Sequence, residues 1–141
     1  MKKKCARAVP FVETRIHHLS EIAEDYVEIV FDLIEQKGEA RIGDIAEHLG
    51  VSHVTVVRTI ERLKKKHYLE SQQHQPVTLT KEGLQLALAS KERHRFLLEY
   101  LLALGVPEEI AAIDVEGMEH HISPLTLQAF QSHLKQLDLQ R

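Results

Sequence analysis

The chain is poor in cysteine, with Cys5 as the only one among its 141 residues, and it contains no tryptophan. A single thiol excludes an intramolecular disulfide and a zinc site built from several thiolates. Apolar runs are also short, and none reaches the ~18 residues that a helix needs to span a bilayer. The basic start at Lys2, Lys3 and Lys4 is not followed by the apolar segment of a secretory signal. We therefore expect a cytoplasmic protein without a membrane segment.

Charge is spread unevenly along the chain. The sequence is 43% hydrophobic and 28% charged, with a formal net charge of −3, which is ordinary for a soluble globular protein. This balance argues only weakly against nucleic-acid binding, because the distribution of charge matters more than its sum. Between Val51 and Tyr68, five Lys and Arg residues stand against Glu61 alone. This segment is therefore positive within an acidic chain.

Helical periodicity dominates the sequence and begins at Ser20. Residues 1–19 show no clear period and contain Pro10, so we expect a flexible N-terminal arm there. From Ser20 an apolar stripe with helical spacing continues to Gly38, a residue suited to the end of a helix. Further helices are predicted over residues 42–49, 52–66, 81–104, 108–121 and 124–137.

Two short β-prone segments interrupt the helices. Residues 68–70 and 77–80 flank the polar stretch 71–75, which is the pattern of a hairpin. A helix, a turn at Gly50, a second helix and then a hairpin follow one another in the order of a winged helix-turn-helix. The sequence thus predicts a mainly α protein, with a winged helix-turn-helix DNA-binding domain over residues 20–80 and a helical domain over residues 81–141.

The basic helix after Gly50 is the candidate for DNA recognition. In a helix-turn-helix this helix lies in the major groove, and its N-terminal residues face the base edges. Arg58 is the best candidate for a bidentate contact to guanine, while Arg62 and Lys64 are better placed for phosphates. The other polar side chains at the start of the helix are Ser52, His53 and Thr55. A basic trihelical unit also serves as a protein-interaction module, so DNA binding does not follow from the pattern alone.

Acidic residues and histidine gather in the segment Asp114–His121. On a helix, Glu116, Glu119 and His120 at positions i, i+3 and i+4 share one face and reach a common point. Hard oxygen donors mixed with imidazole suit Mn²⁺ or Fe²⁺ better than a structural zinc ion. Exposed helices also carry Glu and His at this spacing, so a solvated surface explains the cluster as well. Spacing does not show which remote residues join it.

Four stretches of the chain resemble the manganese-responsive branch of the diphtheria-toxin-repressor family. The most specific is Asp114–His121, with its Glu-Gly-Met-Glu-His-His string. The other three are Ala23–Glu28, Glu39–Ala46 and Glu92–His94. The resemblance runs from about Ser20 to Phe130 in one order with little gapping.

The resemblance implies a homodimeric, metal-activated transcriptional regulator that binds double-stranded operator DNA and no small organic substrate. Its C-terminal domain, here residues 81–141, would bind metal and dimerise. The ligands implied by motif position are Asp25, Glu28, His94, Glu116, Glu119 and His120. Iron-responsive relatives have a methionine and a cysteine where this chain has Asp25 and Glu116. Hard oxygens at both places fit Mn²⁺, one or two ions per subunit, with Fe²⁺ as the alternative.

Two features depart from the family pattern, and other functions stay open. Val54 stands where relatives often have proline, and His53 beside it is unusual. An iron-responsive or metal-independent winged-helix transcription factor, or one that senses a small molecule, would share the same fold. A metalloenzyme is disfavoured, because the chain lacks the paired Glu-x-x-His repeats of helical di-metal centres. We expect a non-enzymatic, Mn²⁺-activated regulator, mainly a repressor, of manganese uptake and homeostasis genes.

Overall fold

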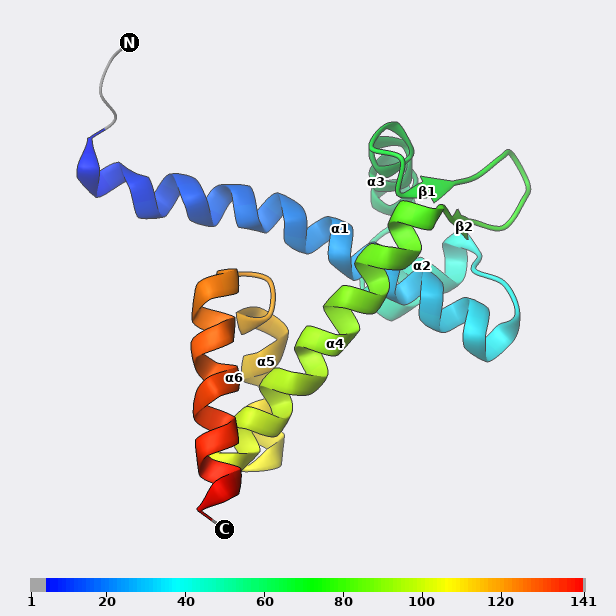
Figure 1. Cartoon of the computed structure of the whole chain (residues 1–141). Helices are drawn as coiled ribbons and strands as arrows, with labels where there is room; N and C mark the ends of the chain where they lie inside the picture. Colours follow the sequence, from blue (N-terminus) through cyan, green and yellow to red (C-terminus); the bar gives the residue numbers. More distant parts are fainter. Residues whose placement is uncertain (1–4, 141) are drawn as a thin grey trace. The chain divides into compact units, whose positions relative to one another are not determined.

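The computed structural model describes residues 5–140, whose helices and strands are labelled in Figure 1. The chain forms two compact units. The central unit comprises Ile22–Lys91, and the split unit combines residues up to Glu21 with those from Glu92 onward. Two long helices, α1 (Val9–Lys37) and α4 (Lys81–Ala103), pass from one unit into the other. None of the helices in the described part of the chain is long and apolar enough to cross a membrane. The predicted domain boundary at residues 80 and 81 stays a prediction.

The helix start expected at Ser20 is wrong. A 3-10 turn, η1 (Ala6–Ala8), leads directly into α1, so the described residues of the expected arm are largely helical. Residues 1–4 of that arm lie outside the described residues. Pro10 is compatible with this start, because the N–H groups of the first helical turn have no intrahelical partner. The expectation of no clear period in residues 1–19 is also wrong, because helical apolar spacing continues upstream through Val9, Val12, Ile16 and Leu19.

The predicted winged helix-turn-helix is confirmed in the central unit. Gly50, with a φ of 67°, ends α2 (Ile42–Leu49) in the left-handed conformation that glycine adopts without steric cost. Ser52 caps α3 (His53–Lys65), because its hydroxyl accepts a hydrogen bond from the Thr55 backbone N–H at 3.1 Å. The wing follows as an antiparallel pair, β1 (Leu69–Glu70) and β2 (Thr78–Leu79).

Hydrogen bonds of Thr80 connect the residues before the wing to the start of α4. Thr80 accepts a hydrogen bond from the Gly83 backbone N–H at 3.0 Å, and its hydroxyl donates to the His67 carbonyl at 2.6 Å. A Cβ at position 83 would overlap the Tyr68 carbonyl oxygen, so only glycine fits there without a backbone shift. The first turn of α4 is thereby fixed against the residue that precedes the wing.

The core of the central unit forms between the apolar stripe of α1, the helix-turn-helix and the wing. The apolar stripe predicted from Ser20 to Gly38 is the face of α1 that packs into this core. The fully buried large side chains of this core are Val27, Val30, Leu33, Ile45, Val56, Ile60, Leu63, Leu69 and Val77.

The split unit packs α4, α5 (Glu108–Met118) and α6 (Pro124–Leu139) around Tyr100. The Tyr100 ring centroid lies 4.8 Å from that of Phe130, and the Tyr100 hydroxyl lies 2.8 Å from His133 Nδ1. α5 ends at Met118, so the end expected near His121 is wrong. The chain turns there before Ser123 caps α6.

Candidate metal centre and nucleic-acid interface

His94, Glu116 and Glu119 form a compact cluster in the split unit. His94 lies on α4, Glu116 near the end of α5, and Glu119 at the C-cap of α5. His94 Nδ1 lies 2.7 Å from Glu119 Oε2 and 3.8 Å from Glu116 Oε1. One ligand atom from each residue lies within 4.8 Å of the others, a separation that one cation spans. The structure therefore groups three of the six predicted ligands.

The buried carboxylate of Glu119 lies between two imidazoles. Its Oε2 contacts His94, while its Oε1 lies 3.1 Å from Nε2 of His120, whose side chain is also buried. Glu119 Oε1 nevertheless accepts no hydrogen bond from any residue that the structure describes. A buried carboxylate oxygen in this state carries a desolvation cost, which a bound cation would offset. The donor set thus fits a metal ion.

The single helical face expected for Glu116, Glu119 and His120 is wrong. α5 ends before Glu119, so that Glu119 and His120 lie in the turn beyond it. The turn places Glu116 and Glu119 near His94, whereas His120 lies near Glu21. Glu119 contacts both His94 and His120. The His94 cluster and the pair of Glu21 with His120 therefore lie in one region of the split unit.

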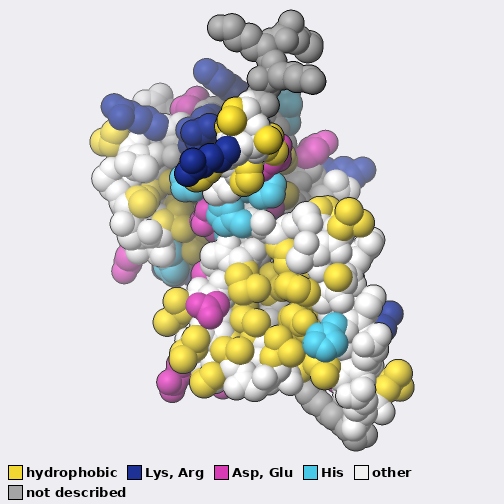
Figure 2. All heavy atoms as spheres, turned by 90° about the vertical axis from the view of Figure 1, so that its left-hand side faces the viewer, with side chains coloured by type: hydrophobic (Ala, Val, Ile, Leu, Met, Phe, Trp, Pro, Cys, Tyr) yellow, Lys and Arg dark blue, Asp and Glu magenta, His cyan; other side chains and the backbone are white. Residues whose placement is uncertain are grey.

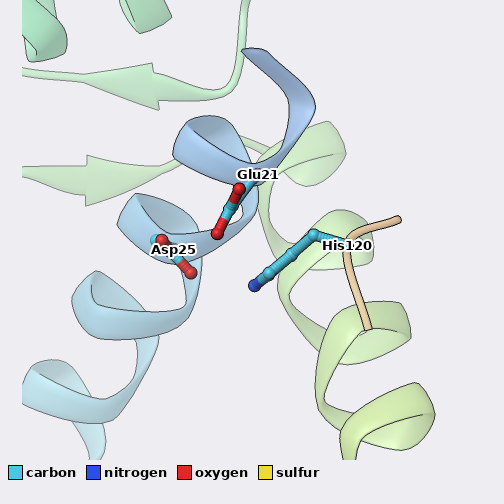
Figure 3. Close-up of side chains that lie close together, drawn as sticks. All are labelled: Glu21, Asp25 and His120. Atoms are coloured by element: carbon cyan, nitrogen blue, oxygen red, sulfur yellow. The ribbon is translucent and has the colours of Figure 1, made fainter. Parts of the chain in front are cut away.

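Glu21 is a member of this region that the sequence analysis did not single out. It lies on α1, one turn before Asp25, and its carboxylate and the ring of His120 turn toward each other (Figure 3). A carboxylate oxygen of Glu21 and a ring nitrogen of His120 lie within 4.8 Å of each other. The i, i+4 spacing of Glu21 and Asp25 was the available signal, but an ordinary acidic helix surface has the same spacing.

Asp25 and Glu28 lie further along α1, in the central unit. Both side chains are half-buried. The carboxylate of Glu28 accepts a hydrogen bond from the hydroxyl of Ser90 on α4. Ser90 is fully buried. This contact fixes the orientation of Glu28. The role of Asp25 and Glu28 as metal ligands stays a prediction.

Two exposed charges flank His94 on α4. The hydrogen bond that Arg95 donates lowers the pKa of Glu92, and the same bond raises the pKa of Arg95. Solvent and salt screen such a pair, so it adds little to stability. The carboxylate of Glu92 is therefore engaged by Arg95, on the solvent side of the helix.

α3 presents the predicted DNA-contacting residues to solvent. Of these, Ser52, His53, Thr55, Arg58 and Arg62 are exposed, and Lys64 is half-buried. The hydroxyls of Ser52 and Thr55 lie 2.8 Å apart and serve the cap of the helix. Lys64 pairs with Glu61 at 3.2 Å, whereas the guanidinium of Arg58 makes no ion pair or hydrogen bond with other described residues. A groove is lined by α3, by the start of α2 at residues 41–43, and by residues 71–75 of the wing; its α3 residues are His53, Val57, Glu61 and Lys64.

Two protein-family models match most of the chain. Residues 18–77 match the model described as iron dependent repressor, N-terminal DNA binding domain. Residues 80–140 match the model described as iron dependent repressor, metal binding and dimerisation domain. The chain belongs to the iron-dependent repressor family. The resemblance drawn from the sequence motifs is therefore confirmed.

Curated relatives carry names from the manganese branch. The transcriptional regulator MntR of Escherichia coli O6:H1 is 48% identical over 120 residues, which cover 85% of this chain and 77% of that protein. The HTH-type transcriptional regulator MntR of Bacillus subtilis strain 168 is 41% identical over 100 residues, covering 71% of this chain and 70% of that protein.

Solved structures share the fold. A structure described as a manganese-dependent transcriptional repressor complex with manganese matches with a TM-score of 0.71 at 29% identity, covering 80% of this chain and 52% of that chain. IdeR of T. acidophilum matches with a TM-score of 0.66 at 28% identity, covering 79% of this chain and 53% of that chain. The chain spans about half the length of these solved relatives.

Proposed function

We propose that this member of the iron-dependent repressor family is a Mn²⁺-activated transcriptional regulator. It binds operator DNA as a homodimer in the cytoplasm and mainly represses genes of manganese uptake and homeostasis. The observation that carries the proposal is the buried carboxylate of Glu119 between His94 and His120. Relatives named MntR, and a related repressor solved with manganese, support the choice of metal.

The proposed donor set is hard and free of sulfur. Its members are Asp25, Glu28, His94, Glu116, Glu119 and His120. Carboxylates with imidazole suit Mn²⁺ or Fe²⁺, and bond lengths of about 2.0–2.2 Å put neighbouring ligand atoms of an octahedral ion about 3 Å apart. The 3.1 Å between Glu119 Oε1 and His120 Nε2 agrees with that spacing. We propose Mn²⁺, as one or two ions per subunit, with Fe²⁺ as the competing ion.

Charge explains how metal acts as a switch in this proposal. If the four carboxylates of the set come together at one centre, they repel one another when ionised, and two divalent ions would neutralise them. α1 begins in the split unit and ends in the core beside the helix-turn-helix, so metal bound by its carboxylates restrains a helix of the DNA-binding domain. If metal favours the DNA-binding state, DNA must favour metal binding by the same factor.

A hydrophobic surface supports the proposed dimer. Figure 2 shows hydrophobic side chains gathered on the face of the molecule where α5 and α6 of the split unit lie. Exposed large hydrophobic residues on these two helices are Ile110, Ile113, Leu125 and Leu139. A contiguous exposed apolar patch marks an interaction surface in a soluble protein. The matched family domain is one that dimerises.

The exposed residues of α3 supply the proposed contacts to operator DNA. Arg58 would read a guanine, and Arg62 and Lys64 would bind phosphates. The other polar side chains at the start of the helix would face the base edges, and they are Ser52, His53 and Thr55. Half-sites on the operator would lie about one DNA turn, or a multiple of it, apart.

Metal-dependent DNA binding tests the proposed function. DNA from upstream of the gene that encodes this protein is titrated with the metal-free protein, with Mn²⁺, Fe²⁺ or Zn²⁺ added in parallel, and the complex is followed by gel shift. Tight binding that requires Mn²⁺ supports the proposal. If the affinity for DNA is the same with and without each of the three metals, the protein is a metal-independent regulator. If binding requires Fe²⁺ alone, the protein is an iron sensor.

A further inference from the structure

Glu21 lies at the centre of a group of histidines in the split unit. Its Oε2 lies 3.0 Å from Nε2 of His121 and 3.3 Å from Nδ1 of His18. The ring of His120 approaches the same carboxylate from the end of α5, within the 4.8 Å that a cation spans (Figure 3). The ligand set implied by the family resemblance includes His120 but neither Glu21 nor the other two histidines.

The two oxygens of Glu21 have different surroundings. Both histidine contacts, from His121 and His18, fall on Oε2. Oε1 makes no hydrogen bond with the described residues. Carboxylates that bind metal are held by hydrogen bonds from outside the coordination shell, which orient the ligating oxygen. Glu21 has this arrangement, because His121 and His18 hold Oε2 while His120 lies near the same carboxylate.

We propose that Glu21 is an additional metal ligand, which binds the ion held by His120, while His121 and His18 orient its carboxylate. This inference rests on the proposed function, because it adds a residue to the same metal centre. A further carboxylate makes the donor set harder and more negative, which strengthens binding of Mn²⁺ relative to softer ions.

The buried oxygen of Glu119 is a second observation that points to a cation beside His120. Glu119 Oε1 lies 3.1 Å from His120 Nε2 and accepts no hydrogen bond within the described part of the chain. His120 therefore has a carboxylate of Glu119 on one side and the carboxylate of Glu21 nearby. His120 thus has two carboxylates near its ring, and carboxylates with imidazole are a donor set that suits a divalent cation.

Direct measurement of Mn²⁺ binding tests the role of Glu21. The full-length, metal-free protein is titrated with Mn²⁺, and the free ion is followed by electron paramagnetic resonance in wild type, Glu21→Gln, Glu21→Asp and Glu13→Gln. Glu13 is exposed on the same helix, so its variant removes the same charge without touching the histidine group. Circular dichroism establishes that each variant is folded. Glu119→Gln is included as a variant of the ligand set on which the proposed function depends.

We expect Glu21→Gln to lower the affinity for Mn²⁺ at least tenfold, and Glu21→Asp to lower it as well because the shorter side chain withdraws the oxygen. Glu13→Gln should bind as wild type does. If Glu119→Gln loses binding while Glu21→Gln keeps it, Glu21 is not a ligand and the proposed function stands. Wild-type affinity in Glu21→Asp would show that only the charge of Glu21 matters, and would also overturn the inference. If wild type itself binds no Mn²⁺, the proposed function fails.

Discussion

His94 Nδ1 lies 2.7 Å from Glu119 Oε2, and this contact joins α4 to the end of α5. The two residues are far apart in the sequence, and each belongs to a segment that resembles the same family. The contact orients the Glu119 carboxylate so that its other oxygen faces His120. A ligand that is already oriented loses little conformational freedom when metal binds. Glu119 is therefore the residue on which the proposed centre depends most.

Ser90 should affect metal binding without being a ligand. It is fully buried and donates a hydrogen bond to the carboxylate of Glu28. If Glu28 binds metal, Ser90→Ala should lower the affinity for Mn²⁺ by about 10- to 100-fold, since partners that orient ligands have effects of that size. Calorimetric titration measures the affinity, and thermal melting of the metal-free variant shows whether the fold is intact. Unchanged affinity in a folded Ser90→Ala protein would count against Glu28 as a ligand.

Gly83 should be required for stability of the central unit. Gly83→Ala would force a Cβ into the Tyr68 carbonyl oxygen, so the backbone at the wing must shift. We expect a loss of about 1–3 kcal/mol in the free energy of unfolding, the usual range for overpacking. Gly43→Ala in α2 is the matched control, because a Cβ there meets no atom within 4 Å. Chemical denaturation should show the control as stable as wild type or slightly more stable, and an equal effect of both variants would contradict the account.

Arg58 should carry part of the sequence preference. Arg58→Ala should weaken binding to the operator by about 1–3 kcal/mol and leave binding to unrelated DNA nearly unchanged, if its guanidinium reads a base. Arg62→Ala should weaken both by a similar factor and reduce the salt dependence, because a phosphate contact carries no sequence information. Fluorescence anisotropy with both DNAs at several salt concentrations separates the two. If Arg58→Ala weakens binding to both DNAs equally, Arg58 contacts a phosphate and not a base.

The helix-turn-helix was the part of the fold that the sequence predicted best. Its helices, the Gly50 turn, the Ser52 cap and the wing follow from apolar spacing and local capping chemistry, and the structure confirms them. The start of α1 was missed because Pro10 suggested a break, although proline is tolerated in a first helical turn.

The residues of the candidate site were harder to predict from the sequence than the fold was. Spacing alone predicted Glu116, Glu119 and His120 as ligands, but the end of α5 changes which residues each of them contacts. His94 entered only through the family resemblance, because nothing in a charged helix surface indicates which distant residue it will face. Glu21 was missed for the same reason, since its contacts to histidines are formed by tertiary packing.

Metal-dependent operator binding by Glu119→Gln tests the central claim most directly. Anisotropy of labelled operator DNA is measured with and without Mn²⁺, and size-exclusion chromatography reports the oligomeric state. Glu109→Gln, an exposed change at the start of α5, serves as the control. We predict that Glu119→Gln remains a dimer but loses the response of DNA binding to Mn²⁺, while the control keeps it. A Glu119→Gln protein that still binds its operator only when Mn²⁺ is present would contradict the account.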